Sequence, residues 1–308
     1  MKSAFLFASE EPWAGDPAFS TLGFIARFGH VRGLRPALRL AFKLACRPDD
    51  GSAWLGELDH YRARMGLCEA GLHAYAPGPL RPFLRAGWTF EQRLRVSRTH
   101  HSAVGAVLPV GAIRNIWALR PMKLGILEGR RGSSFALWLG GADYPREGNL
   151  QISFTRETSD GSPSLPLARL TFSLAEWTDT RARRALLIGG LQGSRHQTAK
   201  RAIIEATRDL RGLRPKAAVT LAAQAFASCA NSDSVLAISD ANHVANARSG
   251  NAPPQKAANY DAFWRERGGL PHALIGFELP ILREDQRPER NAISDCVASI
   301  FDRKKTLL

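Results

Sequence analysis

The chain has 308 residues, of which 44% are hydrophobic and 23% charged, so it can bury a core and is not an intrinsically disordered protein. Lysine and arginine number 42 against 28 aspartate and glutamate, and the formal net charge is +14 at pH 7. This balance favours acidic partners such as nucleic acid, an anionic membrane surface or a phosphorylated ligand, although a genome rich in arginine codons produces it equally well.

The sequence contains no recognisable targeting, membrane-spanning or zinc-binding pattern. The apolar run near the N-terminus is too short for a signal peptide, and no segment approaches the ~20 apolar residues of a membrane-spanning helix. The four cysteines lack CxxC or zinc spacing, which indicates reduced thiols: Cys46, Cys68, Cys229 and Cys296. We therefore predict a cytoplasmic protein.

Basic helices are predicted for residues 21–120, after an irregular lead-in at 1–20. In the first part of this region Pro36 is expected to start a second helix, with an apolar face of Leu38, Ala41, Phe42 and Ala45, and with Arg39 and Lys43 facing away. Such a helix lies on an anionic surface or packs inside the protein with a solvated basic face. A loop is predicted at 48–52, and more helix follows.

From Lys123 onward the residue pattern changes from that of helices to that of β-strands. Five strands are predicted to form a largely antiparallel meander, at 123–129, 134–139, 149–155, 167–174 and 185–188. Helices at 199–210 and 216–230, a strand at 234–239, a short helix at 260–267 and a strand at 274–279 complete a mixed domain over 121–290. A tail is expected at 291–308. The predicted class is α+β, with a helical N-terminal region followed by a mainly antiparallel sheet.

A glycine-rich segment joins the fifth strand to the helix at 199–210. We interpret Gly189 and Gly190 as the start of a tight turn, so that the segment forms a strand–glycine turn–helix–strand unit. Such a unit often holds an anionic group at the helix N-terminus, although a purely structural turn explains the same glycines. Arg214 and Lys216, which flank a proline between two helices, are further candidates for binding phosphate or carboxylate.

The order and spacing of several short motifs resemble the VirK/YbjX family of bacterial proteins. These motifs are GGLQG (189–193), EATRDLRGLRPK (205–216), SDANHV (239–244), YDAFW (260–264) and GFELP (276–280). The resemblance implies a Gram-negative cytoplasm and a link to envelope or virulence phenotypes, and it implies no established reaction. The C-terminal SDCVASIFDRKK departs from the basic, Tyr- and Arg-rich ending of the family.

The predicted strand order also looks like that of the GNAT acyltransferase superfamily, which binds the pyrophosphate of acyl-CoA at a turn and helix N-terminus. This resemblance implies an acyl-CoA cofactor. The segment GGLQGSRHQ does not reproduce the usual acyl-CoA signature of that superfamily. The residues expected to hold the cofactor are Gly189, Gly190, Gln192, Gly193, Arg195, Arg214 and Lys216.

Candidate catalytic residues follow the strand at 234–239 and the break after the strand at 134–139. His243 is the best general acid–base candidate because imidazole titrates near neutrality, and Asn242 and Glu147 are the other catalytic candidates. A substrate pocket is predicted from four further side chains: His100, Tyr260, Asp261 and Trp264. Each also has a structural explanation, such as a satisfied core histidine, a surface ion pair or a helix cap.

Three kinds of function remain open from the sequence. The first is transfer of an acyl or related group from a CoA-type donor in envelope or secondary-metabolite chemistry, with His243 or Glu147 as base. The second is a non-catalytic envelope-associated chaperone or partner. The third is a metal-dependent enzyme with a two-His-one-carboxylate site that uses His100 or His101 with His243. An anionic small molecule or membrane surface is the expected partner, and nucleic acid is disfavoured because aromatic residues do not alternate with the arginines.

Overall fold

The structure is a computed structural model that describes residues 20–177, 183–194, 199–247, 259–281 and 288–305. The chain forms two compact units, Met1–Gly66 and Leu67–Leu308. The sequence placed its main boundary at 120/121 instead. The helices of 69–117 lie in the same unit as the sheet, because α5 packs against β4 and α6 against β2.

The described part of the first unit contains three helices: α1 (Thr21–Arg32), α2 (Leu34–Ala45) and α3 (Pro48–Met65). The Ser20 hydroxyl caps α1 by accepting a hydrogen bond from the Gly23 N–H, and Gly33, with φ of +90°, separates α1 from α2. One face of α2 is buried within the unit, because Ala37 lies against Gly29 of α1 and Leu44 against Gly51 of α3.

The loop predicted at 48–52 is wrong, because these residues form the first turn of α3. Pro48 occupies the first helical position, where a backbone N–H has no partner within the helix, so proline loses no hydrogen bond there. Asp49 and Asp50 place negative charge near the positive end of the helix dipole. These features outweigh the turn-forming tendency of the PDDGS sequence.

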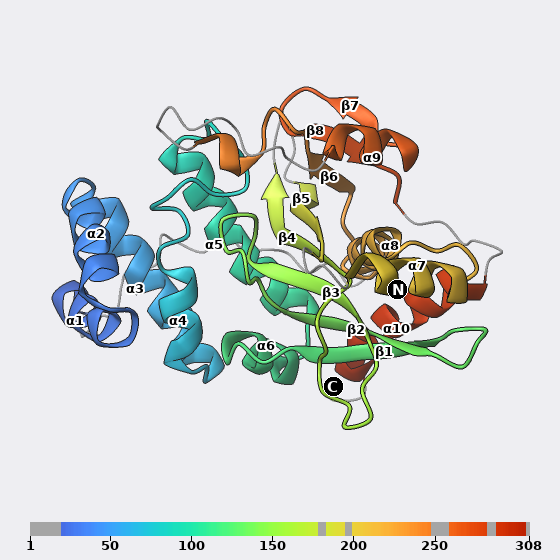
Figure 1. The fold of residues 1–308 in the computed structure, drawn as a ribbon. Helices are drawn as coiled ribbons and strands as arrows, with labels where there is room; N and C mark the ends of the chain where they lie inside the picture. The colour runs from blue at the N-terminus through green and yellow to red at the C-terminus, as the bar shows by residue number, and fades with distance from the viewer. Residues whose placement is uncertain (1–19, 178–182, 195–198, 248–258, 282–287, 306–308) are drawn as a thin grey trace, which may run out of the picture. The chain divides into compact units, whose positions relative to one another are not determined.

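The second unit is an α+β structure, as predicted (Figure 1). Its described helices are α4 (Glu69–Tyr75), α5 (Phe90–Val107), α6 (Val110–Trp117), α7 (Ala199–Asp209), α8 (Pro215–Cys229), α9 (Tyr260–Glu266) and α10 (Pro288–Lys305), with a 3-10 turn η1 (Val244–Ala247). Its strands are β1 (Met122–Glu128), β2 (Ser134–Gly141), β3 (Leu150–Arg156), β4 (Ala168–Trp177), β5 (Arg183–Gly193), β6 (Ser234–Ile238), β7 (Leu270–His272) and β8 (Gly276–Leu279).

These strands form an eight-stranded sheet in the order β1-β2-β3-β4-β5-β6-β8-β7. The first five make the predicted antiparallel meander, and β5 pairs in parallel with β6 after a crossover through α7 and α8. The C-terminal part of β5 and the chain leaving β6 therefore lie at the same end of the sheet.

One face of the sheet is apolar and is covered by α8 and α10. Phe226 of α8 packs edge-to-face against Phe172 of β4 and Phe301 of α10, and Cys296 of α10 lies against Gly125 of β1. Residues 291–305, part of the predicted tail, thus belong to a packed helix. On the other face, cross-strand partners are polar, including Gln151, Ser153, Thr171, Arg169 and Gln192.

The predicted glycine turn at 189–193 is wrong, because all five residues belong to β5. The register between β4 and β5 shifts there: Thr171 faces Gly190 and Phe172 faces Ile188, which leaves Gly189 as an extra residue. The glycines thus form a bulged strand. The glycine turn on which the GNAT resemblance rested is therefore not found at residues 189–193.

Candidate functional site

The two predicted catalytic side chains His243 and Glu147 come together at the end of the sheet where β6 terminates. His243 Nε2 lies 3.5 Å from Glu147 Oε1, and both side chains are about nine-tenths buried, with 9% and 10% exposed. Gln192 Nε2 donates to both carboxylate oxygens of Glu147 at 3.1 Å. We call these three residues and Tyr260, whose ring centroid is 5.3 Å from that of His243, the Glu147 cluster.

The Glu147 cluster explains the glycines of β5. A Cβ atom on Gly190 would lie 1.9 Å from Glu147 Oε2, and one on Gly189 would lie 2.0 Å from the Glu147 backbone oxygen. Only glycine admits Glu147 this close to the strand. Gly189 and Gly190, predicted to hold a cofactor, therefore lie directly against a carboxylate of the protein itself.

The hydrogen bonds of His243 favour Glu147 as the proton acceptor of the cluster. His243 Nδ1 accepts a hydrogen bond from the Ala245 N–H at 3.2 Å, so the neutral ring carries its proton on Nε2. Nε2 is buried, forms no hydrogen bond with the described residues and faces the Glu147 carboxylate. The Nε2–H of His243 therefore faces the Glu147 carboxylate, 3.5 Å away.

Tyr260 joins the cluster to the free edge of β5. Its hydroxyl accepts a hydrogen bond from the Leu191 N–H at 3.3 Å, beyond the part of β5 that pairs with β6. We expect Tyr260→Phe to lower the free energy of unfolding by about 1–3 kcal/mol, because a buried N–H loses its acceptor. Chemical denaturation measures this change. Tyr144→Phe removes the same atom from a side chain that is 41% exposed and is expected to have little effect; equal effects at both sites would contradict the assignment.

Three further predicted site residues hold the chain beside the cluster. Asn242 Nδ2 donates to the Ile275 carbonyl, and Trp264 Nε1 donates to the Ile238 carbonyl at 2.9 Å. Asp261 accepts from the Asp240 N–H at 2.7 Å, while the Asp240 carboxylate accepts from the N–H groups of Tyr260 and Asp261. These reciprocal bonds join the end of β6 to α9, so all three residues have structural partners.

His100 lies in the core beneath β4, where its Nδ1 contacts the backbone of Leu174 at 3.1–3.2 Å. Burial lowers the pKa of His100 to about 4, so the ring is neutral near pH 7. His101 packs beside it, with ring centroids 5.2 Å apart. Within the described residues no group of three or more His, Cys, Asp or Glu side chains is placed to hold a metal.

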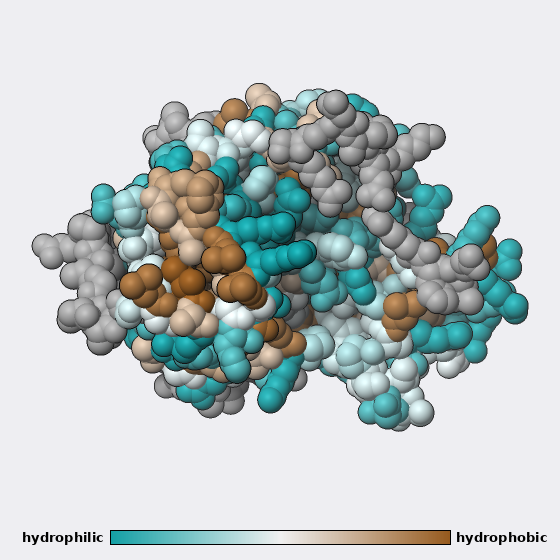
Figure 2. Space-filling model, turned by 60° about the vertical axis from the view of Figure 1, so that its left-hand side comes forward, coloured by the Kyte–Doolittle hydropathy of each residue, from teal (hydrophilic) through white to brown (hydrophobic). Residues whose placement is uncertain are grey.

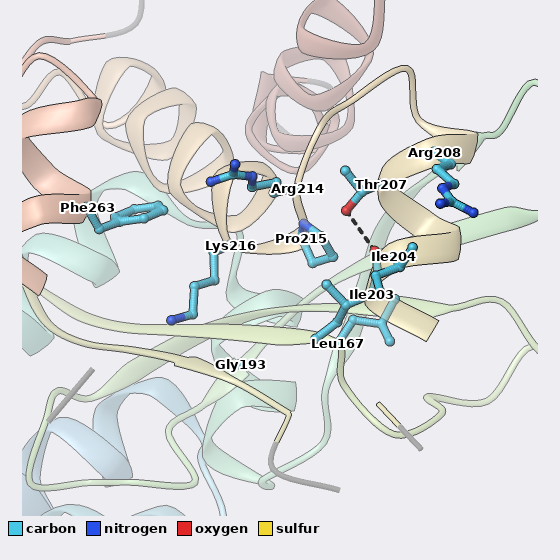
Figure 3. Close-up of a pocket in the computed structure, with 10 residues that line it drawn as sticks. All are labelled: Leu167, Gly193, Ile203, Ile204, Thr207, Arg208, Arg214, Pro215, Lys216 and Phe263. Atoms are coloured by element: carbon cyan, nitrogen blue, oxygen red, sulfur yellow. Dashed lines mark hydrogen bonds between the residues drawn. The ribbon is translucent and has the colours of Figure 1, made fainter. Parts of the chain in front are cut away.

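A groove of about 560 Å³ lies between the end of β5, the two crossover helices and α9 (Figure 3). It brings together three of the predicted cofactor residues, Gly193, Arg214 and Lys216; Arg195 lies outside the described residues. We call it the α7–α8 groove, and it is lined by Leu167, Gly193, Ile203, Ile204, Thr207, Arg208, Arg214, Pro215, Lys216 and Phe263.

The α7–α8 groove combines positive charge with an apolar wall. The described residues that line it include no acidic side chain. In Figure 3 Arg214 extends toward Phe263, Lys216 extends toward Gly193, and Arg208 points away on the outer side of α7. The aliphatic side chains gather opposite: Leu167, Ile203, Ile204 and Pro215. Sequence periodicity had placed Ile203 on the buried face of its helix, so the apolar wall was not foreseen.

Lys216 is the central cation of this groove. It is half-buried, burial lowers its pKa, and no carboxylate of the described residues lies within ion-pair distance. Among the described carboxylates, Arg214 has a long contact with Glu266, 3.6 Å between two exposed side chains, which contributes little. The first turn of α8 contains no acidic residue, and its Arg214 N-cap makes no side-chain capping bond. An anion placed here gains from both the side chains and the helix N-terminus.

The groove and the Glu147 cluster lie on opposite faces of the sheet. Successive side chains of a strand point to opposite faces, and Gln192 belongs to the cluster while Gly193 lines the groove. Lys216, at the start of α8, lies against Gly193 on the apolar face. Glu147 is therefore separated from the groove by β5.

A scan against known families matches residues 29–294 to a model described as "Protein of unknown function (DUF535)". The chain belongs to the DUF535 family. A relative with 28% identity over 262 residues is described as "Uncharacterized protein YbjX" of Escherichia coli (strain K12), and the match covers 82% of this chain and 74% of that protein.

Membership of the DUF535 family confirms the VirK/YbjX resemblance predicted from the motifs. No solved structure matches the chain, so the GNAT resemblance has no structural support. Among the helices of the described residues, none is long and apolar enough to cross a bilayer.

Proposed function

We propose that the second unit binds an anionic, partly apolar small molecule in the α7–α8 groove. The observation that carries this proposal is Lys216, a half-buried cation without a described carboxylate partner, at the meeting point of an apolar wall and a helix N-terminus. Leaving such a charge half-buried is unfavourable, and an anionic ligand would compensate it.

A CoA thioester has the chemistry that suits this lining. Its phosphate groups would contact Lys216, Arg214 and the first turn of α8, and its acyl chain would contact Ile203 and Ile204. Ile204 is 42% exposed, so this part of the apolar wall has no cover from the described residues. The sequence-based prediction of an acyl-CoA ligand is therefore retained as part of this proposal.

Acyl transfer requires in addition a base within reach of the bound thioester. The placement of Glu147 on the other face of the sheet favours binding over a transfer step that uses Glu147 or His243 at the groove. The envelope or secondary-metabolite setting stays a prediction that follows from the family. We carry forward ligand binding as the function that the groove supports best.

Calorimetric titration of the full chain with octanoyl-CoA tests this proposal. We expect Lys216→Met and Arg214→Met each to raise the Kd roughly 10- to 100-fold, because a charge-assisted hydrogen bond contributes roughly 1.5–3 kcal/mol. Methionine retains an apolar stem, so packing is largely kept. Free CoA and pyrophosphate are expected to bind more weakly than octanoyl-CoA, since neither contacts the apolar wall.

Arg201→Met is the matched control, because Arg201 lies on α7 with 89% of its side chain exposed and, within the described part of the chain, pairs with Glu205. It removes the same charge at a distance from the groove lining. Unchanged affinity in Lys216→Met and Arg214→Met, or an equal loss in Arg201→Met, would show that the groove is not the binding site.

A further inference from the structure

The first unit exposes a face of large apolar side chains. Leu22 is 79% exposed, Val31 60%, Leu34 71%, Leu38 60% and Phe42 71%. The last three are spaced four residues apart on α2, so they form one stripe along that helix. We call Leu34, Leu38 and Phe42 the apolar face of α1–α2, and Figure 2 shows a hydrophobic surface over these helices.

This face is not the side of α2 that holds the unit together. The packing side consists of Ala37, Leu40 and Leu44, which are at most 5% exposed and contact α1 and α3. Monomeric soluble proteins rarely leave a contiguous group of large apolar side chains in water, so such a group indicates an interaction surface.

All formally charged side chains of α1 and α2 are basic. Residues 20–48 contain six lysines and arginines and no aspartate or glutamate. Arg35 and Arg39 each follow a residue of the stripe and are exposed, and Arg32 and Arg47 are exposed at the ends of α1 and α2. A partner must therefore offer an apolar interior bordered by negative charge.

We propose that α1–α2 docks on a membrane surface that contains anionic lipids. Acyl chains would cover the apolar stripe, and lipid phosphates would contact the arginines that flank it, as in helices that lie in the plane of the bilayer interface. A second copy of this chain fits less well, because two faces bordered by like charge repel each other. This inference is independent of the α7–α8 groove.

Co-sedimentation of the full chain with phospholipid vesicles tests the proposal. We expect binding to phosphatidylcholine vesicles with about 30% phosphatidylglycerol, and at least about tenfold weaker binding to pure phosphatidylcholine or in about 0.5 M NaCl. Leu38→Glu with Phe42→Glu is expected to abolish binding to the anionic vesicles, and Arg35→Glu with Arg39→Glu to weaken it at least about tenfold.

A matched control replaces two exposed leucines of the second unit, Leu165→Glu with Leu270→Glu, which are 57% and 69% exposed. This variant is expected to bind vesicles like the wild type. Equal binding by the Leu38/Phe42 variant, or equal binding to neutral vesicles, would overturn the proposal. A second result would also overturn the proposal. In it, the wild type does not bind vesicles and forms a dimer, measured by light scattering, whereas the Leu38/Phe42 variant is monomeric.

Discussion

Gly189→Ala is expected to destabilise the second unit by about 3 kcal/mol, because the new Cβ atom meets the Glu147 backbone oxygen and the packed core must shift. For a unit of this size, this corresponds to a fall in melting temperature of roughly 6–12 °C. The clash distance of 2.0 Å is to backbone, which cannot rotate away. Thermal and chemical denaturation measure the change.

Gly190→Ala distinguishes the Glu147 side chain from the Glu147 backbone as the cause of the clash. The new Cβ atom at position 190 meets the carboxylate, whereas the one at position 189 meets the backbone oxygen. In a Glu147→Ala background the cost of Gly190→Ala should largely disappear, while the cost of Gly189→Ala should remain. Gly111→Ala on α6, where a Cβ atom meets nothing within 4 Å, serves as a neutral control. Full cost of Gly190→Ala in both backgrounds would contradict the explanation of the β5 glycines.

Acidification is expected to destabilise the second unit well before its carboxylates are protonated. His100 has a folded-state pKa of about 4, because it is buried, whereas an unfolded histidine titrates near its ordinary pKa of 6.5. The unfolded state therefore binds more protons between these values, and stability is lost as the pH falls through this window. The loss from His100 alone is about 3 kcal/mol.

Burial also lowers the pKa of the neighbouring His101, which adds to the loss in the same direction. Denaturation curves between about pH 7 and about pH 4 measure the free energy of unfolding. In His100→Gln the dependence on pH should be clearly shallower, even though the variant is less stable at every pH. A free energy that does not change with pH, or an unchanged slope in the variant, would contradict the buried neutral state of His100.

The sequence predicted most of the secondary structure of the second unit. Alternating apolar residues identified β1 to β4, and the periodicity of α7 and α8 was clear enough to place both helices within one or two residues. Antiparallel order followed from the short connections between strands. These features are local, so they can be read from neighbouring residues.

The bulge at Gly189 could not be predicted, because it depends on a residue 42 positions earlier in the chain. A pair of glycines reads as a turn unless the approach of the Glu147 side chain and backbone is known. The contact between His243 and Glu147 likewise depends on how β3, β4, β5 and β6 pair, because these four strands lie between the two residues in the chain. Each residue was identified as a candidate from the sequence. Only the structure shows that the two side chains are in contact and that His243 Nε2 is buried against Glu147.

The α7–α8 groove was predicted only in part for the same reason. Arg214 and Lys216 were recognised from their position beside a proline, whereas Phe263, Leu167 and Ile203 come from three other segments. Sequence periodicity assigns Ile203 to the core and cannot show that part of that face lines a groove. Of the described residues of the expected glycine-turn site, Gly193 is the one that lines the groove.

Hydrogen–deuterium exchange of the full chain with and without octanoyl-CoA tests the location of the ligand most directly. Binding in the groove predicts slower exchange in the first turn of α8 after Arg214, in α7 and in α9 around Phe263, with no change in α2. The same protection should be lost in Lys216→Met and kept in Arg201→Met. Protection confined to segments outside the groove, or no protection at ligand concentrations that saturate calorimetric binding, would contradict the proposed site.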